Sequence, residues 1–256
     1  MPSNANDRLN EIEIVNQGYD KEALIEAISQ ALSDFYKALI HNIESLDLNK
    51  IVKAKNPYLF RAKAMNSASD IINSILSAFV SSSEETIFGN VFFEPIAKSL
   101  STGMKALANG IDIGVEKDDV IYAIAVKSGP KVFNADSKAR QEQNFQEGFR
   151  RVMHEKKRYV AIIGYGYGKK QNSGRGKPRM YVEYAGQAFW TSMTGDPEFY
   201  VKLIKYMGDM PEKYSDAFQR VYEATENRLT GEFIEHYCDP KGNILWEKLI
   251  QDNSGI

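Results

Sequence analysis

Residues 110–130 read GIDIGVEKDDVIYAIAVKSGP, and this stretch decides the fold that the sequence predicts. Apolar residues alternate with polar or small ones from Ile111 to Val115. A charged run, 116–119, follows, and a second apolar segment covers 120–127. Alternation with a period of two on either side of a polar turn is typical of a β-hairpin. We therefore expect two strands joined at residues 116–119.

The hairpin carries an acid and a lysine where an apolar pattern would not place them. Asp112 lies within the first expected strand, and Lys127 ends the second, just before a Ser-Gly-Pro sequence. A carboxylate binds a hard cation through oxygen, and a lysine can orient an attacking water or stabilise charge on a phosphate. The pair suits Mg²⁺-dependent cleavage of a phosphodiester. Taken alone, the stretch is explained more simply by an edge hairpin with both side chains solvated.

Composition describes an ordinary globular chain. Its 256 residues are enough for one large domain, or one domain with a helical appendage, and 43% apolar residues can form a core. The 34 acidic and 32 basic residues nearly cancel. A nucleic acid would therefore have to bind a local basic surface, because the chain as a whole is not a polycation.

Several classes of protein are disfavoured. The single cysteine, Cys238, excludes a disulfide framework and a cysteine-based zinc site, and it fits a reducing cytosol. The histidines show no ligand spacing, no apolar run approaches the roughly 20 residues that span a bilayer, and residues 1–14 have no signal core. We expect no membrane association and a soluble cytoplasmic protein, bacterial by hypothesis, although no physical feature fixes the organism.

Helical periodicity brackets the hairpin. It predicts helices over about 20–43, 64–80, 84–101, 134–155, 197–207 and 211–236, with further strands at 158–164 and 179–184. We expect Ser81–Ser83 to end the second of these helices and to cap the third. The predicted single domain, 1–256, has a helical N-terminal part (about 19–100), a sheet core (about 108–190) and a helical C-terminal part (about 197–250).

Two stretches are candidates for contact with a nucleic-acid backbone. The connector 53–63 carries Lys53, Lys55, Arg61 and Lys63, although a loop held in the core by its aromatic residues explains it equally well. Between 150 and 180 the only acid is Glu155, and the bases include Lys169, Lys170, Arg175 and Lys177. The excess of basic residues in this stretch favours contact with a nucleic-acid backbone over the alternative, a solvated hairpin tip.

Three glutamates are candidates for a further metal ligand. Glu94 lies among apolar and aromatic residues and leads directly towards Asp112. Glu84 and Glu85 fall where the third helix is expected to begin, so they also suit a role in its first turn. Exposure of Glu94 to solvent and capping by the other two are the commoner fates of such residues.

Several segments, taken together, resemble type II restriction endonucleases of the PD-(D/E)xK superfamily, in particular the PmeII-like group that cuts GG/CC-rich palindromes. The matching segments fall in order across roughly residues 53–200. They are KNPYLFRAK (55–63), EETIFGNVFFEPIA (84–97), GIDIG with AIAVKSGP (within 110–130), AIIGYGYGKK (161–170) and GQAFWTSMTGDPEFY (186–200). The ordered set is much more specific than the Asp-Lys pair alone.

The resemblance implies an α/β fold of the α+β kind, a mixed sheet flanked by helices with helical segments at both ends. It implies a two-fold homodimer and Mg²⁺-dependent cleavage of double-stranded DNA. By carry-over, Asp112 is the metal-binding acid and Lys127 is the lysine of the motif. Glu94 and Glu85 are auxiliary acids.

One position departs from the motif, which has Asp or Glu two residues before its lysine, where this chain has Ala125. The missing carboxylate could come from elsewhere, from Glu94 first and from Glu85 or Glu84 next. The chain could instead be inactivated by substitution, or it could be a natural binder that does not cut. We prefer the first explanation.

The sequence therefore predicts a type II site-specific deoxyribonuclease that hydrolyses double-stranded DNA at a short palindromic site. The alternatives are a catalytically inactive DNA-binding protein of the nuclease fold and, more distantly, an α/β interaction protein. Polar residues after the second strand could contact bases, although a solvated helix face is the simpler account of each: Ser137, Lys138, Arg140, Gln141 and Asn144.

Overall fold

The structure is a computed structural model that describes residues 12–101, 107–170 and 179–255. The chain divides into two compact units. The first unit comprises Met1–Leu32 with Phe88–Met210 and contains the sheet, and the second comprises Ser33–Ile87 with Pro211–Ile256 and is helical in its described part. Helices α2 (Lys21–Glu44) and α5 (Ala68–Val91) have residues in both units.

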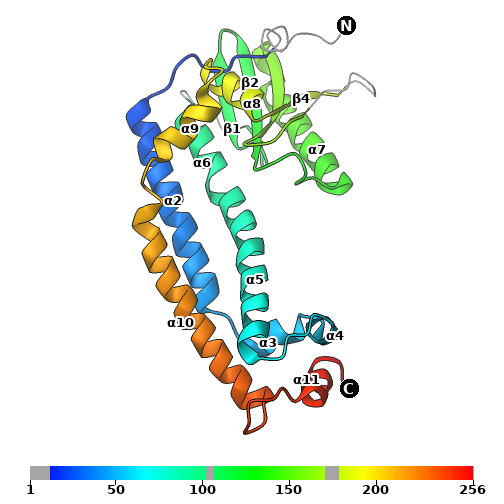
Figure 1. The fold of residues 1–256 in the computed structure, drawn as a ribbon. Helices are drawn as coiled ribbons and strands as arrows, with labels where there is room; N and C mark the ends of the chain where they lie inside the picture. Colours follow the sequence, from blue (N-terminus) through cyan, green and yellow to red (C-terminus); the bar gives the residue numbers. More distant parts are fainter. Residues whose placement is uncertain (1–11, 102–106, 171–178, 256) are drawn as a thin grey trace, which may run out of the picture. The chain divides into compact units, whose positions relative to one another are not determined.

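A mixed sheet of four strands is the centre of the first unit (Figure 1). Its order is β1 (Ile113–Lys117), β2 (Val120–Lys127), β3 (Arg158–Tyr165) and β4 (Tyr181–Ala185). The β1–β2 pair is antiparallel, and the β2–β3 and β3–β4 pairs are parallel. The predicted hairpin and the α+β fold class are confirmed.

The hairpin turn is shorter than the sequence suggested. Asp118 and Asp119 form it with φ angles of +49° and +59°. Positive φ at both central residues is the geometry of a two-residue turn whose twist matches the flanking strands. Strand β1 therefore extends to Lys117 and begins at Ile113, so Asp112 lies just before the strand and not inside it.

Helices cover both faces of the sheet. Phe145 of α7 (Ala135–Val152) packs in a buried cluster with Ala125 of β2 and Ile163 of β3, which defines one face. The opposite face meets α6 (Phe93–Ser99) and α8 (Gln187–Thr194), because a Cβ on Gly164 would lie 2.1 Å from the ring of Phe189. Strand β2 is buried from Val120 to Val126, so the apolar run of 120–126 reflects two covered faces.

Gly164 is needed for the close approach of α8 to β3. An added Cβ would lie 2.1–2.7 Å from three ring atoms of the fully buried Phe189, so Gly164→Ala should overpack the core. We expect the free energy of unfolding to fall by about 1–3 kcal/mol. Gly231→Ala is the matched control, since Gly231 lies in α10 (Glu212–Tyr237) with nothing within 4 Å of the new Cβ. The free energy of unfolding of Gly231→Ala should rise by up to about 1 kcal/mol. Denaturant titration of both variants measures the difference, and equal stability would contradict this account.

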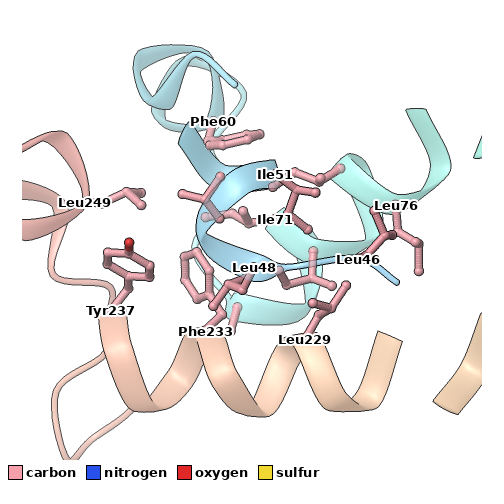
Figure 2. Packing of buried hydrophobic residues seen from close by; sticks show 14 of the residues in the cluster. Leu46, Leu48, Ile51, Phe60, Ile71, Leu76, Leu229, Phe233, Tyr237 and Leu249 are labelled. Atoms are coloured by element: carbon pink, nitrogen blue, oxygen red, sulfur yellow. The ribbon is translucent and has the colours of Figure 1, made fainter. Parts of the chain in front are cut away.

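The second unit is built around a buried apolar cluster (Figure 2). Parts of α2 and α5 pack there with α3 (Leu48–Lys53), α4 (Pro57–Ala62), α10 and α11 (Trp246–Ser254). The basic connector, 53–63, thus begins at the last residue of α3 and contains α4, which starts with Asn56 as N-cap and Pro57. The Nδ2 of Asn253 donates to the carbonyls of Val52, Lys53 and Lys55 and so ties α11 to this segment.

One predicted helix boundary is wrong. The serine run 81–83 lies inside the continuous helix α5, and Glu84 and Glu85 are interior residues of that helix, neither caps nor first-turn residues. Serine is only moderately unfavourable within a helix. The apolar residues of α5 pack into the cluster before the run, through Ile75 and Leu76. Tertiary packing therefore outweighs the local stop signal.

The remaining helices complete the first unit. Helix α7 begins with a capping box between Asn134 and Ser137, and the 3₁₀ turn Met153–Glu155 follows its end. Helix α9 (Phe199–Met207) follows α8, and Phe199 packs against Trp190. No helix among the described residues is long and apolar enough to cross a membrane.

Candidate active site

Asp112 is held at the start of the hairpin by backbone contacts. Its N–H donates to the carbonyl of Ile124 at 2.9 Å, although the strand register pairs Ile124 with Ile113. Its Oδ2 accepts the N–H of Val126 at 2.7 Å. The side chain is 17% exposed, so one part of the carboxylate is fixed by the protein while the group can still be approached from solvent.

Lys127 lies at the end of β2, beside Asp112. Its Nζ is 3.5 Å from Asp112 Oδ2 and donates to the carbonyl of Val126 at 2.9 Å, and its side chain is 31% exposed. The structure thus brings together the acid and the lysine that the sequence singled out. Their charges would let this edge of the sheet bind both a cation and the oxygens of a phosphate.

Ala125 lies between the two residues of β2 that bond to Asp112. The antiparallel register ends with Ile113 opposite Ile124, and Asp112 then donates its N–H to Ile124 and accepts the N–H of Val126. A carboxylate at position 125 would share a cation with Asp112, but the present side chain is a fully buried methyl group.

The candidate auxiliary acids differ in their surroundings. Glu94 lies in the first turn of α6 and forms an ion pair with Lys98 at 2.5 Å. Helix α6 packs on the face of the sheet opposite to that of Ala125, since a Cβ on Gly166 would meet Phe93 at 2.2 Å. The described residues contain no group of three or more His, Cys, Asp or Glu side chains that could hold a metal ion. Which acid supplements Asp112 therefore stays a prediction.

Helix α5 reaches the end of β2 through Gly89. A Cβ on this residue would lie 3.0 Å from both Cβ and Oγ of Ser128, the residue after Lys127. Glu84 and Glu85 belong to the second unit, where burial, together with the charge of Glu85, raises the pKa of Glu84 above its ordinary value.

The residues proposed for base contact on α7 have different fates. Gln141 is buried, and its Nε2 donates to the carbonyl of Gly110 at 2.7 Å. This bond anchors the segment before Asp112, contrary to the expectation that Gln141 contacts a base. The side chain of Asn144 also lies against Gly110, where φ is +76° and a Cβ would be 2.0 Å from Asn144 Nδ2. Arg140 is exposed, and its role stays a prediction.

The basic stretch 150–180 is not one continuous positive surface. Arg151 pairs with Glu147, Lys157 with Glu116 and Glu155, and Arg158 forms a two-pronged pair with Glu13. Most of these acids lie outside the stretch, so its one-sided composition overstates the charge that solvent meets. Lys169 and Lys170 follow β3, while Arg175 and Lys177 lie outside the described residues.

The other basic candidates belong to the second unit. Lys53, Arg61 and Lys63 are exposed, and Lys55 is partly buried. Arg61 donates to Asn66 and lies over the ring of Trp246, which fixes its guanidinium locally. Contact of these residues with DNA stays a prediction.

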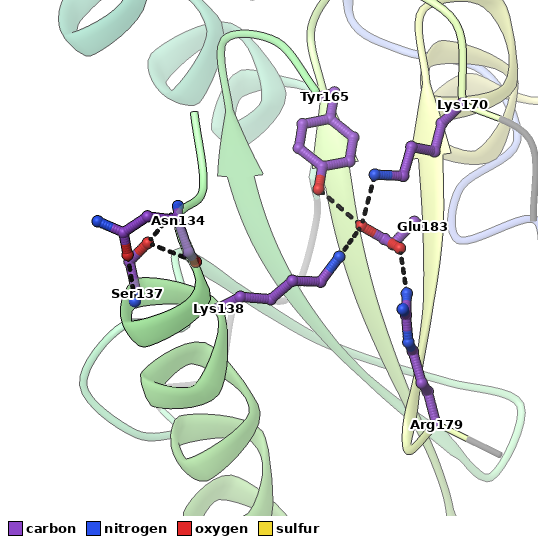
Figure 3. Close-up of polar contacts among 7 residues, drawn as sticks. All are labelled: Asn134, Ser137, Lys138, Tyr165, Lys170, Arg179 and Glu183. Atoms are coloured by element: carbon purple, nitrogen blue, oxygen red, sulfur yellow. Dashed lines mark hydrogen bonds and ion pairs between the residues drawn. The ribbon is translucent and has the colours of Figure 1, made fainter. Parts of the chain in front are cut away.

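A buried acid that the sequence analysis did not single out is Glu183, in β4. Its side chain is 1% exposed and accepts bonds from Tyr165, Lys138 and Arg179 (Figure 3). The signal was a charged residue in the middle of the apolar strand YVEYA, 181–185. Such a residue looks the same in sequence whether it is solvated or buried with cations.

Comparison with known proteins places this geometry in a family. Residues 22–215 match the family described as type II restriction endonuclease EcoO109I, and this range includes the whole sheet with Asp112, Ala125 and Lys127. No curated protein matches the chain. The family match spans more than half of the chain.

Proposed function

The chain belongs to the EcoO109I family of type II restriction endonucleases, and from this we propose that it cuts double-stranded DNA at a short palindromic site. The observation that carries the proposal is the Asp112–Lys127 pair, held at the exposed end of a mixed sheet by the β1–β2 register. An acid and a lysine so placed can serve one scissile phosphate between them.

The donor set of the site is compatible with Mg²⁺ through Asp112. Magnesium is commonly held by one or two carboxylates together with waters and the substrate's phosphate oxygens. Asp112 offers one carboxylate, partly exposed and already fixed by the N–H of Val126. When bound, such an ion polarises the phosphate and lowers the pKa of a bound water. Glu94, which belongs to the same unit as Asp112, is our proposal for a further carboxylate, and it would first have to leave Lys98.

Lys127 is proposed to act on the reacting phosphate itself. Its ammonium has three N–H donors, of which the carbonyl of Val126 accepts one and Asp112 Oδ2, at 3.5 Å, accepts another. The remaining donor can orient the attacking water and stabilise the negative charge that develops on the phosphate. The bond to Val126 fixes the side chain before DNA arrives, so little reorganisation is needed.

A two-fold homodimer is proposed as the working form. A palindromic site presents the same sequence on both strands, so two identical subunits related by a two-fold axis can each cut one strand. The GG/CC-rich specificity of the PmeII-like group is the site class that we propose to test first.

Ala125 favours a second candidate, a DNA-binding protein of this family that does not cut. The supporting observation is the buried methyl group of Ala125, which lies where the motif has its second acid, between the two β2 residues that bond to Asp112. Both candidates predict DNA affinity that falls steeply with salt, because cations that contact phosphates release counterions. They differ in whether phosphodiester bonds are broken.

Digestion of unmethylated phage DNA with and without Mg²⁺ tests the proposal. The endonuclease should give discrete fragments that require Mg²⁺ and disappear with EDTA. Salt-sensitive DNA binding with intact DNA would support the second candidate. If the protein neither cuts the DNA nor binds it in a salt-sensitive way, both candidates are overturned.

A further inference from the structure

Glu183 is the centre of a charged cluster that the proposed chemistry does not use (Figure 3). Its Oε1 accepts from the hydroxyl of Tyr165 at 2.8 Å and from Lys138 Nζ at 3.0 Å, and it lies 3.3 Å from Lys170 Nζ. Its Oε2 accepts from Arg179 Nη1 at 2.7 Å. One buried carboxylate thus contacts three cations.

The cluster has an excess of positive charge directed outward. The Glu183 side chain is 1% exposed, whereas those of Lys138, Lys170 and Arg179 are 27%, 25% and 53% exposed. An ammonium has three donors and a guanidinium has five, so each cation has more donors than the carboxylate requires. The three cations come from α7, from the segment after β3 and from the segment before β4, and all three meet at Glu183.

The cluster lies on the same face of the sheet as the candidate active site. The parallel register pairs Lys127 with Tyr165, and it pairs both Ala125 and Glu183 with Ile163. Tyr165 therefore lies between the two sites and donates its hydroxyl to Glu183. Strands β2 and β4 are two strand spacings apart, roughly 10 Å, so one DNA strand could reach both sites.

The rings of the cluster help to fix the cations. Lys170 Nζ lies 5.5 Å from the centre of the Tyr165 ring, and the guanidinium of Arg179 lies 5.8 Å from that of Tyr181. Burial alone would raise the pKa of Glu183. The hydrogen bonds from Tyr165 and Lys138 and the nearby lysine charges outweigh burial and lower it, so the carboxylate is ionised at neutral pH.

We infer that Glu183 is a positioning residue that gathers Lys138, Lys170 and Arg179 into one site for a backbone phosphate of the bound DNA. The inference rests on the proposed function, because the ligand is the DNA that the active site would cut. It places in one site Lys138, which the sequence suggested for base contact, and Lys170, which it suggested for backbone contact. Glu183 itself does not touch the DNA.

Salt-dependent binding of a duplex, measured without Mg²⁺ so that no cutting occurs, tests the inference. Lys170→Gln should lower affinity roughly tenfold and reduce the slope of log K against log salt by about one. Lys157→Gln is the matched control, since Lys157 is also an ion-paired lysine, is 24% exposed against 25% for Lys170, and lies before the other end of β3. It should change affinity less than about twofold, because one lysine without a phosphate contact contributes little.

Glu183→Gln separates positioning from simple charge. Removing a negative charge should strengthen DNA binding if charge alone matters, whereas loss of positioning should weaken it about tenfold and reduce the salt slope. Glu116→Gln is its control, because it removes the acid that pairs with Lys157, and it should leave affinity within about twofold. If Glu183→Gln does not fold, Lys170→Gln and Arg179→Gln decide the matter.

The outcomes distinguish the inference from the proposed function. Wild-type binding that falls with salt, combined with unchanged affinity and slope in Lys170→Gln and Arg179→Gln, would overturn the phosphate site alone. Tighter binding by a folded Glu183→Gln would also overturn it. A wild-type protein with no salt-sensitive DNA binding would overturn the proposed function and the inference together.

Discussion

Asp112→Asn is expected to lower the rate of DNA cleavage by about 10³-fold or more, while the protein still folds and binds DNA. The amide has nearly the same shape as the carboxylate and can still accept the N–H of Val126. It lacks the charge that holds a hard cation, and cation stabilisation of a phosphate contributes several kcal/mol, with each 1.36 kcal/mol worth tenfold. The rate should be measured on a short duplex with saturating Mg²⁺.

Asp118→Asn is the matched control for this substitution. Asp118 lies in the turn of the same hairpin at a φ of +49°, a conformation that asparagine adopts readily. Cleavage by this variant should stay within about twofold of the original rate, since turn substitutions that fit the backbone are nearly neutral. Equal activity in both variants would mean that Asp112 is not the metal-binding acid.

Ala125→Glu is expected to increase Mg²⁺-dependent cleavage by at least about tenfold. The new carboxylate would lie between Ile124 and Val126, the two β2 residues that bond to Asp112, so two carboxylates could hold one cation. The position is fully buried, and without metal the larger side chain should cost about 1–3 kcal/mol of stability. Addition of Mg²⁺ should recover part of that loss, and a thermal melt with and without the ion measures it.

Ala125→Gln has the same bulk without the charge and is the matched control. It should lose similar stability, gain nothing from Mg²⁺ and cut no faster than the chain as it stands. If a folded Ala125→Glu loses both cleavage and any response to Mg²⁺, position 125 is not the place of the missing acid. That outcome would leave Glu94 as the proposed second ligand.

The sheet was largely predictable because β-strand alternation is a local signal. Strand β2 occupies the predicted residues 120–127, and the Asp112–Lys127 pair follows once its hairpin forms. The bounds of β1 were less accurate, because the four charged residues 116–119 look like a turn although only Asp118 and Asp119 form it. The serine run in α5 was wrongly predicted to end a helix. Its local propensity is weaker than the packing of the helix in the apolar cluster.

The ion pairs could not be predicted, because their partners are distant in sequence. Lys138 is 45 residues from Glu183, and Arg158 is 145 residues from Glu13. A charge count over 150–180 therefore includes the bases but omits most of the acids that pair with several of them. For the same reason the sequence did not find Glu183, whose significance lies in the cations that converge on it.

Digestion of phage DNA by Lys127→Ala beside the unaltered protein tests the central claim most directly. Lys127 is 31% exposed, so its removal should not disturb the fold, and a binding assay checks that DNA affinity persists. The account predicts discrete Mg²⁺-dependent fragments from the unaltered protein and intact DNA with Lys127→Ala. The same fragments at the same rate from both proteins would contradict it, because the Asp112–Lys127 pair could not then be the catalytic centre.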